Sequence, residues 1–225
     1  MDMGSIVQAI DRYRLNAIAG ETSQIVQLAR YVAGLSEDQR TTLQLSVTKA
    51  EYTSEPMTPR QRKFVKSISP TIAMSSFIGS AEAGPWAAST AELTESVLYR
   101  EYADFIFDDR LIHLEFLPFS IKEDPSRQTP SVSDGEKGLL VQTSLQRLRN
   151  PLVRYVCGDV ASLHPLPEQI KARLTSEAAA HYRIVRIFGR DREMSFDWYA
   201  EYFSFSVVHA QMETESWGIL QYQII

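Results

Sequence analysis

The aromatic-rich stretch of residues 182–222 reads YRIVRIFGRDREMSFDWYAEYFSFSVVHAQMETESWGILQY. It contains ten of the chain's 23 aromatic residues. Each buried aromatic side chain removes a large apolar area from water and contributes roughly 1.5–3 kcal/mol. We therefore expect the chain to organise its core around this stretch.

The end of the stretch has the pattern of a hairpin. Segments 202–212 and 217–225 are rich in β-branched and aromatic residues, and the short polar segment 213–216 separates them. This pattern predicts two antiparallel strands, with Phe203, Phe205 and Val207 on one face. Four aromatic residues of the region are candidates for an exposed binding face or a pocket wall. They are Trp198, Tyr199, Tyr202 and Trp217.

The segment before the hairpin allows two interpretations. We favour a helix from Pro167 to about Ala180, followed by a strand to Phe188, because Ile184, Val185 and Ile187 are β-branched. A single helix that ends at Gly189 is the alternative.

The first 69 residues predict helices. Apolar residues recur at helical spacing from Ile6 to Ala17, so a first helix should end at Gly20, and a second should run from Thr22 or Ser23 to Gly34. Two further helices are expected at capping boxes, in which side chains three residues apart satisfy the free N–H groups of a helix start. The boxes are Ser36 with Gln39 and Thr58 with Gln61.

The middle of the chain predicts mixed structure. The uncharged run 67–81 indicates a tightly packed connector, or a surface that another subunit covers. We expect a helix from Ser89 that includes Phe105, a strand over 111–121, a helix over 139–149 and a short strand over 152–157. Residues 123–138 are polar and rich in Pro, Ser and Gly, which predicts a mobile loop.

Together these elements predict an α+β fold. A helical portion, 1–69, is followed by a mixed portion, 70–225, with a C-terminal antiparallel sheet. A chain of 225 residues that is 44% hydrophobic can form one sizeable core, so we expect one continuous domain.

Composition limits the expected binding partners and cellular location of the protein. The net charge of -5 argues against binding along nucleic acid or an anionic membrane through the whole surface. The single cysteine excludes an intramolecular disulfide, and neither a signal peptide nor a long apolar run is present. We expect a soluble cytoplasmic protein with no membrane partner.

Candidate catalytic and metal-binding residues are few. Cys157 and His164 could support thiolate chemistry only if the fold brings them together. His113 and Glu115 have the His-x-Glu spacing of zinc deaminases, but such a site also needs a Cys-x-x-Cys pair, which a chain with one cysteine cannot supply. The carboxylates Asp104, Asp108 and Asp109 could hold Mg²⁺, although an acidic turn explains them more simply. The sequence therefore predicts no metal and no cofactor.

Two groups of basic residues could contact phosphates. The first consists of Arg60, Arg62, Lys63 and Lys66, with Phe64 among them, and the second of Arg147, Arg149 and Arg154. Cationic side chains beside an aromatic ring can hold a phosphate and stack a base. Solvated helix faces often have the same composition.

On these grounds the sequence favours a non-enzymatic structural or interaction protein that self-assembles, as a scaffold or viral coat-like subunit does. The apolar end 221–225 could pair between chains in a homo-oligomer. The alternative is a small-molecule-binding domain or enzyme with an aromatic-lined pocket, and a nucleic-acid-binding protein is the third hypothesis.

Overall fold

The computed structural model of the protein describes residues 2–96, 102–122, 129–149, 151–191, 195–198, 201–204 and 211–212. The chain folds into two compact units. Unit 1 comprises Met1–Ser76, Thr90–Tyr99 and Ser206–Ile225, and unit 2 comprises Phe77–Ser89 and Arg100–Phe205.

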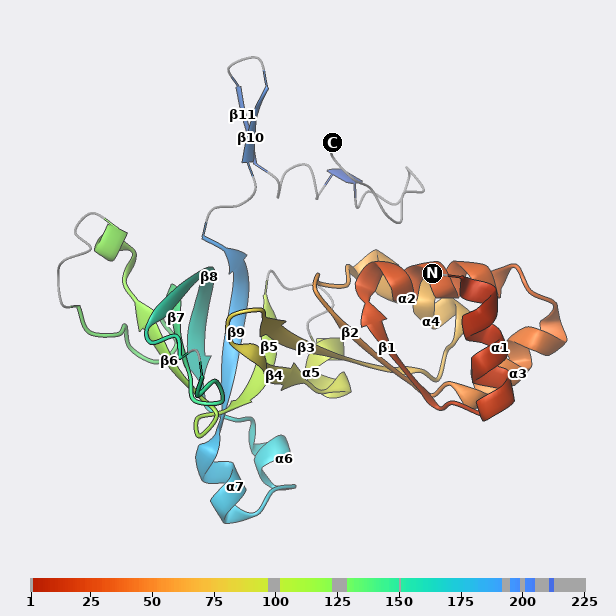
Figure 1. Ribbon diagram of the computed structural model, residues 1–225, viewed down its shortest axis with the longest axis horizontal. Coiled ribbons are helices and arrows are strands. Elements are labelled where there is room, and N and C mark those ends of the chain that lie inside the picture. The colour runs from red at the N-terminus through yellow and green to blue at the C-terminus, as the bar shows by residue number, and fades with distance from the viewer. Residues whose placement is uncertain are drawn as a thin grey trace. The chain divides into compact units, whose positions relative to one another are not determined.

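Helices, a mixed sheet of nine strands and a separate two-stranded sheet make up the described structure, so the mixed α+β class is confirmed (Figure 1). The strands are hydrogen-bonded in the order β1-β2-β3-β4-β5-β9-β8-β7-β6. Strand β3 (Ala73–Ser80) contributes residues to both units.

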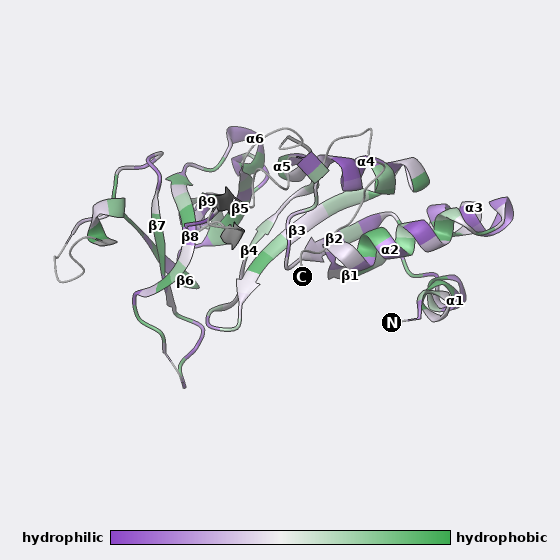
Figure 2. Cartoon of the chain, turned by 90° about the horizontal axis from the view of Figure 1, so that it is seen from above, coloured by the Kyte–Doolittle hydropathy of each residue, from purple (hydrophilic) through white to green (hydrophobic). Residues whose placement is uncertain are grey.

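Unit 1 alternates helices with parallel strands. Strand β2 (Lys49–Thr53) pairs in parallel with β1 (Ala17–Glu21) on one side and with β3 on the other. The helices are α1 (Met3–Tyr13), α2 (Thr22–Ala33), α3 (Glu37–Ser46), α4 (Pro59–Ile68) and α5 (Ala91–Ser96). The helices of this unit carry both hydrophobic and hydrophilic stretches (Figure 2), as expected when one helix face is buried. Their core includes Val26, Ala50, Val65 and Met74.

The expectation of a purely helical N-terminal portion was wrong. Helix α1 ends at Tyr13 because Arg14 adopts a left-handed conformation, φ 51°, and donates its backbone N–H to the Ile10 carbonyl. Residues 17–21 then form β1, whose backbone groups are satisfied by pairing with β2. The other helix starts follow the sequence pattern, since both predicted capping boxes are present at Ser36 and Thr58.

Unit 2 is built on antiparallel pairing. Its strands pair in the order β4-β5-β9-β8-β7-β6, and the last four lie side by side in Figure 1. Their bounds are Gly84–Ser89 for β4, Ala103–Asp108 for β5, Ile112–Leu117 for β6, Gly138–Ser144 for β7, Tyr155–His164 for β8 and Tyr182–Arg190 for β9. Short helical segments are η1 (Phe119–Lys122), α6 (Glu168–Lys171) and α7 (Ser176–His181).

The helix expected from Ser89 is present only as the short α5, and the helix expected over 139–149 is a strand over its first part. Phe105 lies in β5, and residues 138–144 form β7 between β6 and β8. The consecutive apolar residues Leu139, Leu140 and Val141 are all buried, which fits a central strand covered on both faces. The favoured interpretation of residues 167–188 is confirmed in outline, because short helices precede strand β9.

The described core of unit 2 is aromatic. Trp86, Phe105, Phe107 and Phe116 are buried together with Ile112 and Val185. The hairpin expected over 202–225 falls mostly outside the described residues. The described hairpin pairs β10 (Ser195–Trp198) with β11 (Glu201–Ser204).

Candidate functional site

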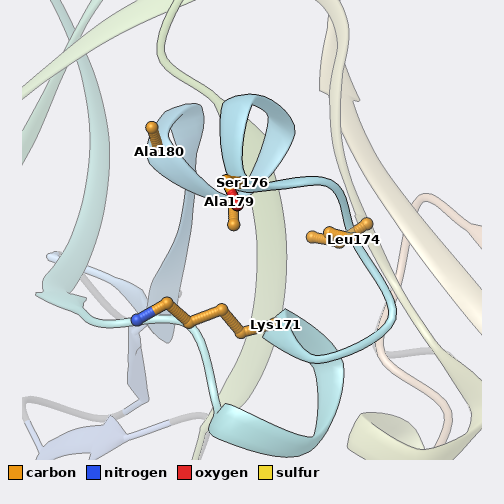
Figure 3. A pocket seen from close by; sticks show the side chains of 5 residues that line it. All are labelled: Lys171, Leu174, Ser176, Ala179 and Ala180. Atoms are coloured by element: carbon orange, nitrogen blue, oxygen red, sulfur yellow. The ribbon is translucent and has the colours of Figure 1, made fainter.

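Two hollows in the described surface of unit 2 are weak candidates for a ligand site. One lies between α6 and α7 (Figure 3), and its polar side chains are only Lys171 and Ser176. The other is lined by more charged groups, but Asp109, Asp134 and Arg183 already have charged partners. Asp109 contacts His181 at 2.8 Å, and Arg183 lies 3.8 Å from Asp134. Neither hollow offers the few converging polar groups that fix a ligand.

A cluster of polar side chains gathers elsewhere in unit 2. We call Glu82, Tyr155, Cys157, Asp159 and Arg190 the carboxylate cluster. Glu82 comes from the turn after β3, the next three residues from the start of β8, and Arg190 from the end of β9. The residues are separated by up to 108 positions in sequence, and the antiparallel pairing of β8 with β9 brings most of them together.

An irregularity in β8 shapes the cluster. Gly158 has a φ of +82°, which an L side chain rarely adopts, and the register between β8 and β9 shifts between Val160 and Ala161. The shift leaves Asp159 opposite Arg190. The backbone N–H of Asp191 donates to the Gly158 carbonyl at 2.7 Å, and this bond fixes the bulged segment.

Arg190 holds the bulged segment through its side chain as well. Its Nη1 donates to the Cys157 carbonyl at 2.7 Å, and its Nε lies 3.3 Å from Asp159 Oδ1. Arg190 is 64% exposed and the Asp159 side chain only 16% exposed. An accessible guanidinium group therefore stands next to a carboxylate that is largely shielded from water.

The Asp159 carboxylate is contacted from two sides. Oδ1 faces Arg190, and Oδ2 accepts a hydrogen bond from the Cys157 thiol at 3.3 Å. Burial raises the pKa of Asp159, while the charge of Arg190 and the Cys157 hydrogen bond act in the opposite direction.

Cys157 is a protonated thiol in this setting. Burial, and then the charge of Asp159, raise its pKa to about 12. His164 does not act on it, since the His164 Nε2 lies 2.8 Å from the Ser162 hydroxyl. Because the thiolate is the nucleophilic form, this geometry does not support nucleophilic catalysis by Cys157.

Glu82 and Tyr155 form the other half of the cluster. Hydrogen bonds from the Glu82 backbone and from Ser80 lower the pKa of Glu82, and the charge of Glu82 raises the pKa of Tyr155. The turn is anchored on both sides. Ala83 donates its N–H to the Ser80 hydroxyl at 3.0 Å and accepts at its carbonyl from the Ser144 hydroxyl at 3.2 Å.

The cluster thus combines two carboxyl groups, a phenol and an accessible guanidinium group. Carboxylates accept hydrogen bonds from hydroxyl groups, and a guanidinium group binds phosphate or carboxylate through paired N–H donors. A ligand that presents both hydroxyl groups and an anionic group matches this arrangement.

Unit 1 contains the first predicted basic cluster, on α4. Arg62 is only 5% exposed, and its Nη2 donates to the Tyr52 hydroxyl at 2.6 Å. Its side chain therefore points into the core, away from any phosphate at the surface. Phosphate binding by Arg60, Lys63 and Lys66 stays a prediction.

The predicted aromatic site lies largely outside the described residues. Trp198 and Tyr202 are placed by their backbones only, opposite Glu201 and Asp197 in the β10–β11 hairpin. Tyr199 and Trp217 lie outside the described residues. An aromatic-lined pocket at these positions stays a prediction.

The acidic residues considered for metal binding are used in ion pairs. Asp104 pairs with Arg186 at 2.7 Å, Asp108 with Arg110 at 2.7 Å and Glu115 with Arg154 at 3.0 Å. Within the residues that the structure describes, no three His, Cys, Asp or Glu side chains are grouped to hold a metal ion.

Sequence reasoning did not find most of the carboxylate cluster. Of its members only Cys157 was considered, and for a different chemistry. The available signal was a glycine directly before a charged residue at two places, Gly158-Asp159 and Gly189-Arg190. Both glycines have positive φ, at +82° and +111°.

No family model and no curated protein matches this chain. Several solved structures share its fold. The 2-hydroxyisobutyryl-CoA ligase in complex with R3-HIB-AMP aligns with a TM-score of 0.63 and 17% identity, over 93% of this chain and 40% of the ligase. The long-chain-fatty-acid-CoA ligase FadD1 from Archaeoglobus fulgidus aligns with a TM-score of 0.56 and 12% identity, over 96% of this chain and 40% of that enzyme.

The amide bond synthetase McbA from Marinactinospora thermotolerans is a third, with a TM-score of 0.55 and 14% identity, over 92% of this chain and 38% of that enzyme. The chain thus spans about two fifths of each of these proteins. At such identities the similarity shows the fold alone, and this fold is one that acyl-CoA ligases and an amide bond synthetase contain.

The comparison corrects the functional expectation from sequence. The favoured hypothesis, a non-enzymatic structural or viral coat-like subunit, was wrong, because the three proteins named above that share the fold are enzymes, two ligases and an amide bond synthetase. A site assembled from residues of distant strands leaves no contiguous motif in the sequence. Within the described residues, no helix is long and apolar enough to cross a membrane.

Proposed function

We propose that this chain is part of an enzyme that activates a carboxylic acid as an acyl adenylate, and that the carboxylate cluster belongs to its nucleotide-binding surface. The proposal takes up the enzyme alternative. It is supported by the fold and by two related ligase structures, one "in the postadenylation state" with 2-HIB-AMP and one with 2-HIB-AMP and CoA "in the thioesterfication state".

The reaction has two halves. In the first, a carboxylate oxygen attacks the α-phosphorus of ATP, the bond to the β-phosphate breaks, and pyrophosphate leaves. In the second, a nucleophile attacks the acyl carbon and AMP leaves. The related proteins use a CoA thiol in the ligase and form an amide in the synthetase, by the names that they carry.

The carboxylate cluster has suitable chemistry for an adenosine nucleotide. A shielded carboxylate that is held from two sides can accept hydrogen bonds from two neighbouring ribose hydroxyls without first reorganising. Asp159 is such a group, held between Arg190 and Cys157. Arg190 is accessible and can donate to an anionic or hydroxyl oxygen of the same ligand. The fixed position of Asp159 is the observation that carries the assignment.

Isothermal titration of the purified chain with ATP and with AMP tests the assignment. Asp159→Asn should weaken binding by about tenfold or more, because it replaces a charged acceptor. Asp134→Asn is a matched control, since that carboxylate is exposed elsewhere in unit 2. The absence of nucleotide binding by the wild-type chain, or equal loss in both variants, would contradict the proposal.

A cytoplasmic location remains part of the proposal. ATP is a cytoplasmic substrate, and the one cysteine forms no disulfide with another residue of the chain. The expected homo-oligomer also stays a prediction, and light scattering on the purified chain would test it.

A further inference from the structure

We propose that Cys157 is a positioning residue that fixes the Asp159 carboxylate in the orientation needed to bind the nucleotide. This inference rests on the proposed function, and it assigns a role to a side chain that need not touch the ligand.

The thiol and the carboxylate are close because the pairing of β8 with β7 is irregular there, with residues 157–159 opposite the single residue Leu140. Cys157 and Asp159 flank Gly158, whose left-handed conformation is open to glycine and costly for other residues. The Cys157 Sγ lies 3.3 Å from Asp159 Oδ2. Arg190 holds the same segment from the other side, through the Cys157 carbonyl and Asp159 Oδ1.

In these contacts each oxygen of the Asp159 carboxylate has a different partner. Arg190 restrains Oδ1, and the thiol restrains Oδ2, so the carboxylate cannot rotate without losing one of them. Arg190 alone would leave Oδ2 unrestrained within the described contacts. The thiol therefore supplies the second point that defines the plane of the carboxylate.

The thiol has a second acceptor within reach. The Leu140 carbonyl of β7 also lies 3.3 Å from Cys157 Sγ, and one thiol proton can serve only one acceptor at a time. A charged carboxylate is the stronger acceptor, so the proton points to Asp159 while Asp159 is ionised. When Asp159 is protonated, its O–H can donate to the sulfur and the thiol can turn to Leu140. The contact is kept in both states.

The protonation states support this role. Cys157 remains a neutral donor throughout the physiological range because its pKa is about 12. The groups that act on the Asp159 charge are Arg190 and Cys157, and both lower the pKa of Asp159 against the effect of burial. Removing the thiol should therefore raise the pKa of Asp159 and shift nucleotide binding toward higher pH.

The test compares Cys157→Ala and Cys157→Ser with the wild-type chain. AMP and ATP affinities are measured by titration calorimetry from pH 5 to pH 8, and the Asp159 carboxyl is followed by carbon NMR, with Asp159→Asn to assign its signal. Val156→Ala is the control, since that neighbouring side chain is 53% exposed. Circular dichroism establishes that each variant is folded.

We expect Cys157→Ala to weaken AMP binding by about tenfold at pH 6 and to move the low-pH loss of affinity to higher pH, because a hydrogen bond to a charged group is lost. Cys157→Ser keeps a donor and should restore most of the affinity and the wild-type pH profile. Val156→Ala should behave as wild type.

The outcomes separate the two proposals. A wild-type chain that binds neither AMP nor ATP overturns the proposed function, whatever the NMR titration of Asp159 shows. A wild-type chain that binds nucleotide, together with a Cys157→Ala variant of equal affinity and unshifted Asp159 titration, overturns the positioning role alone. Equal losses in the Ala and Ser variants would also overturn it, because the hydroxyl can donate where the thiol did.

Discussion

Arg186 and Asp104 face each other across strands β9 and β5 and form a two-point ion pair. The Arg186 Nε lies 2.7 Å from Asp104 Oδ1, and the Nη2 lies 2.9 Å from Oδ2. The Asp104 side chain is 9% exposed and that of Arg186 23%. The guanidinium group also stacks on the Tyr102 ring at 3.8 Å. The pair therefore fixes two central strands of unit 2 from a mostly shielded position.

Asp104→Asn should lower the free energy of unfolding by about 2–4 kcal/mol, because it leaves a shielded guanidinium without its counter-charge. Urea denaturation followed by fluorescence measures the change. The matched control is Glu168→Gln, which breaks the exposed Lys171–Glu168 pair and should change stability by less than about 0.5 kcal/mol. Similar small effects in both variants would contradict the assignment.

The raised pKa of Cys157 predicts a loss of stability in alkaline solution. The pKa of Cys157 is about 12 in the folded chain, above the 9.0 of an ordinary cysteine thiol, so the unfolded chain releases the thiol proton first. The contribution of the protonated Cys157 thiol to the free energy of unfolding is fully present below about pH 9 and is lost as the pH rises toward 12. Above pH 9, the free energy of unfolding of the wild-type chain should therefore fall by up to about 1 kcal/mol more per pH unit than that of Cys157→Ala. Parallel pH profiles for the two proteins would refute this.

Local sequence signals predicted the helix starts but not the strand order. The Ser36 and Thr58 capping boxes depend on residues three positions apart, and both are present in the structure. The apolar run from Leu139 is equally compatible with a helix and with a central strand. The run forms a strand because it pairs with β8 on one side and β6 on the other, with Leu139 opposite Val160 and Leu117. Those partners are 21 and 22 residues away, so no local pattern identifies them.

The candidate site was hidden for the same reason. Asp159 and Arg190 are 31 residues apart, and they face each other only because the β8–β9 register shifts by one residue at Val160. A sequence pattern can mark the glycines that permit the bulge. It cannot state the register that places a guanidinium group opposite a particular carboxylate.

Arg190→Lys should loosen the bulged segment while keeping the charge. A lysine has one ammonium group and cannot reach both the Cys157 carbonyl and Asp159 with the geometry of a guanidinium group. We expect faster hydrogen exchange at the Asp191 amide, which donates to Gly158, and a stability loss of at most about 1 kcal/mol, since Arg190 is exposed. Arg183→Lys, on the same strand, is the control. Unchanged exchange at Asp191 would show that the backbone bond does not depend on Arg190.

The contact between Arg62 and Tyr52 in unit 1 predicts that substitutions of these two residues have strongly non-additive effects on stability. The Arg62 guanidinium is buried, donates from Nη2 to the Tyr52 hydroxyl at 2.6 Å, and has no hydrogen-bond partner at Nη1. Tyr52→Phe removes the acceptor and should cost about 1–3 kcal/mol, because a buried charged donor is left unsatisfied. Arg62→Met removes the charge and should cost less than about 1 kcal/mol, since a well-packed apolar side chain can replace a buried charge.

The double variant decides whether the two effects share one cause. If Tyr52→Phe lowers stability because it leaves the Arg62 guanidinium without its hydrogen-bond acceptor, Tyr52→Phe should have almost no effect on stability in the Arg62→Met background. Chemical denaturation of the four proteins of this cycle measures the coupling, with Lys49→Met, exposed on the same strand as Tyr52, as the surface control. Additive costs would mean that Tyr52 stabilises unit 1 through its packing among the residues of the core rather than through its hydroxyl group.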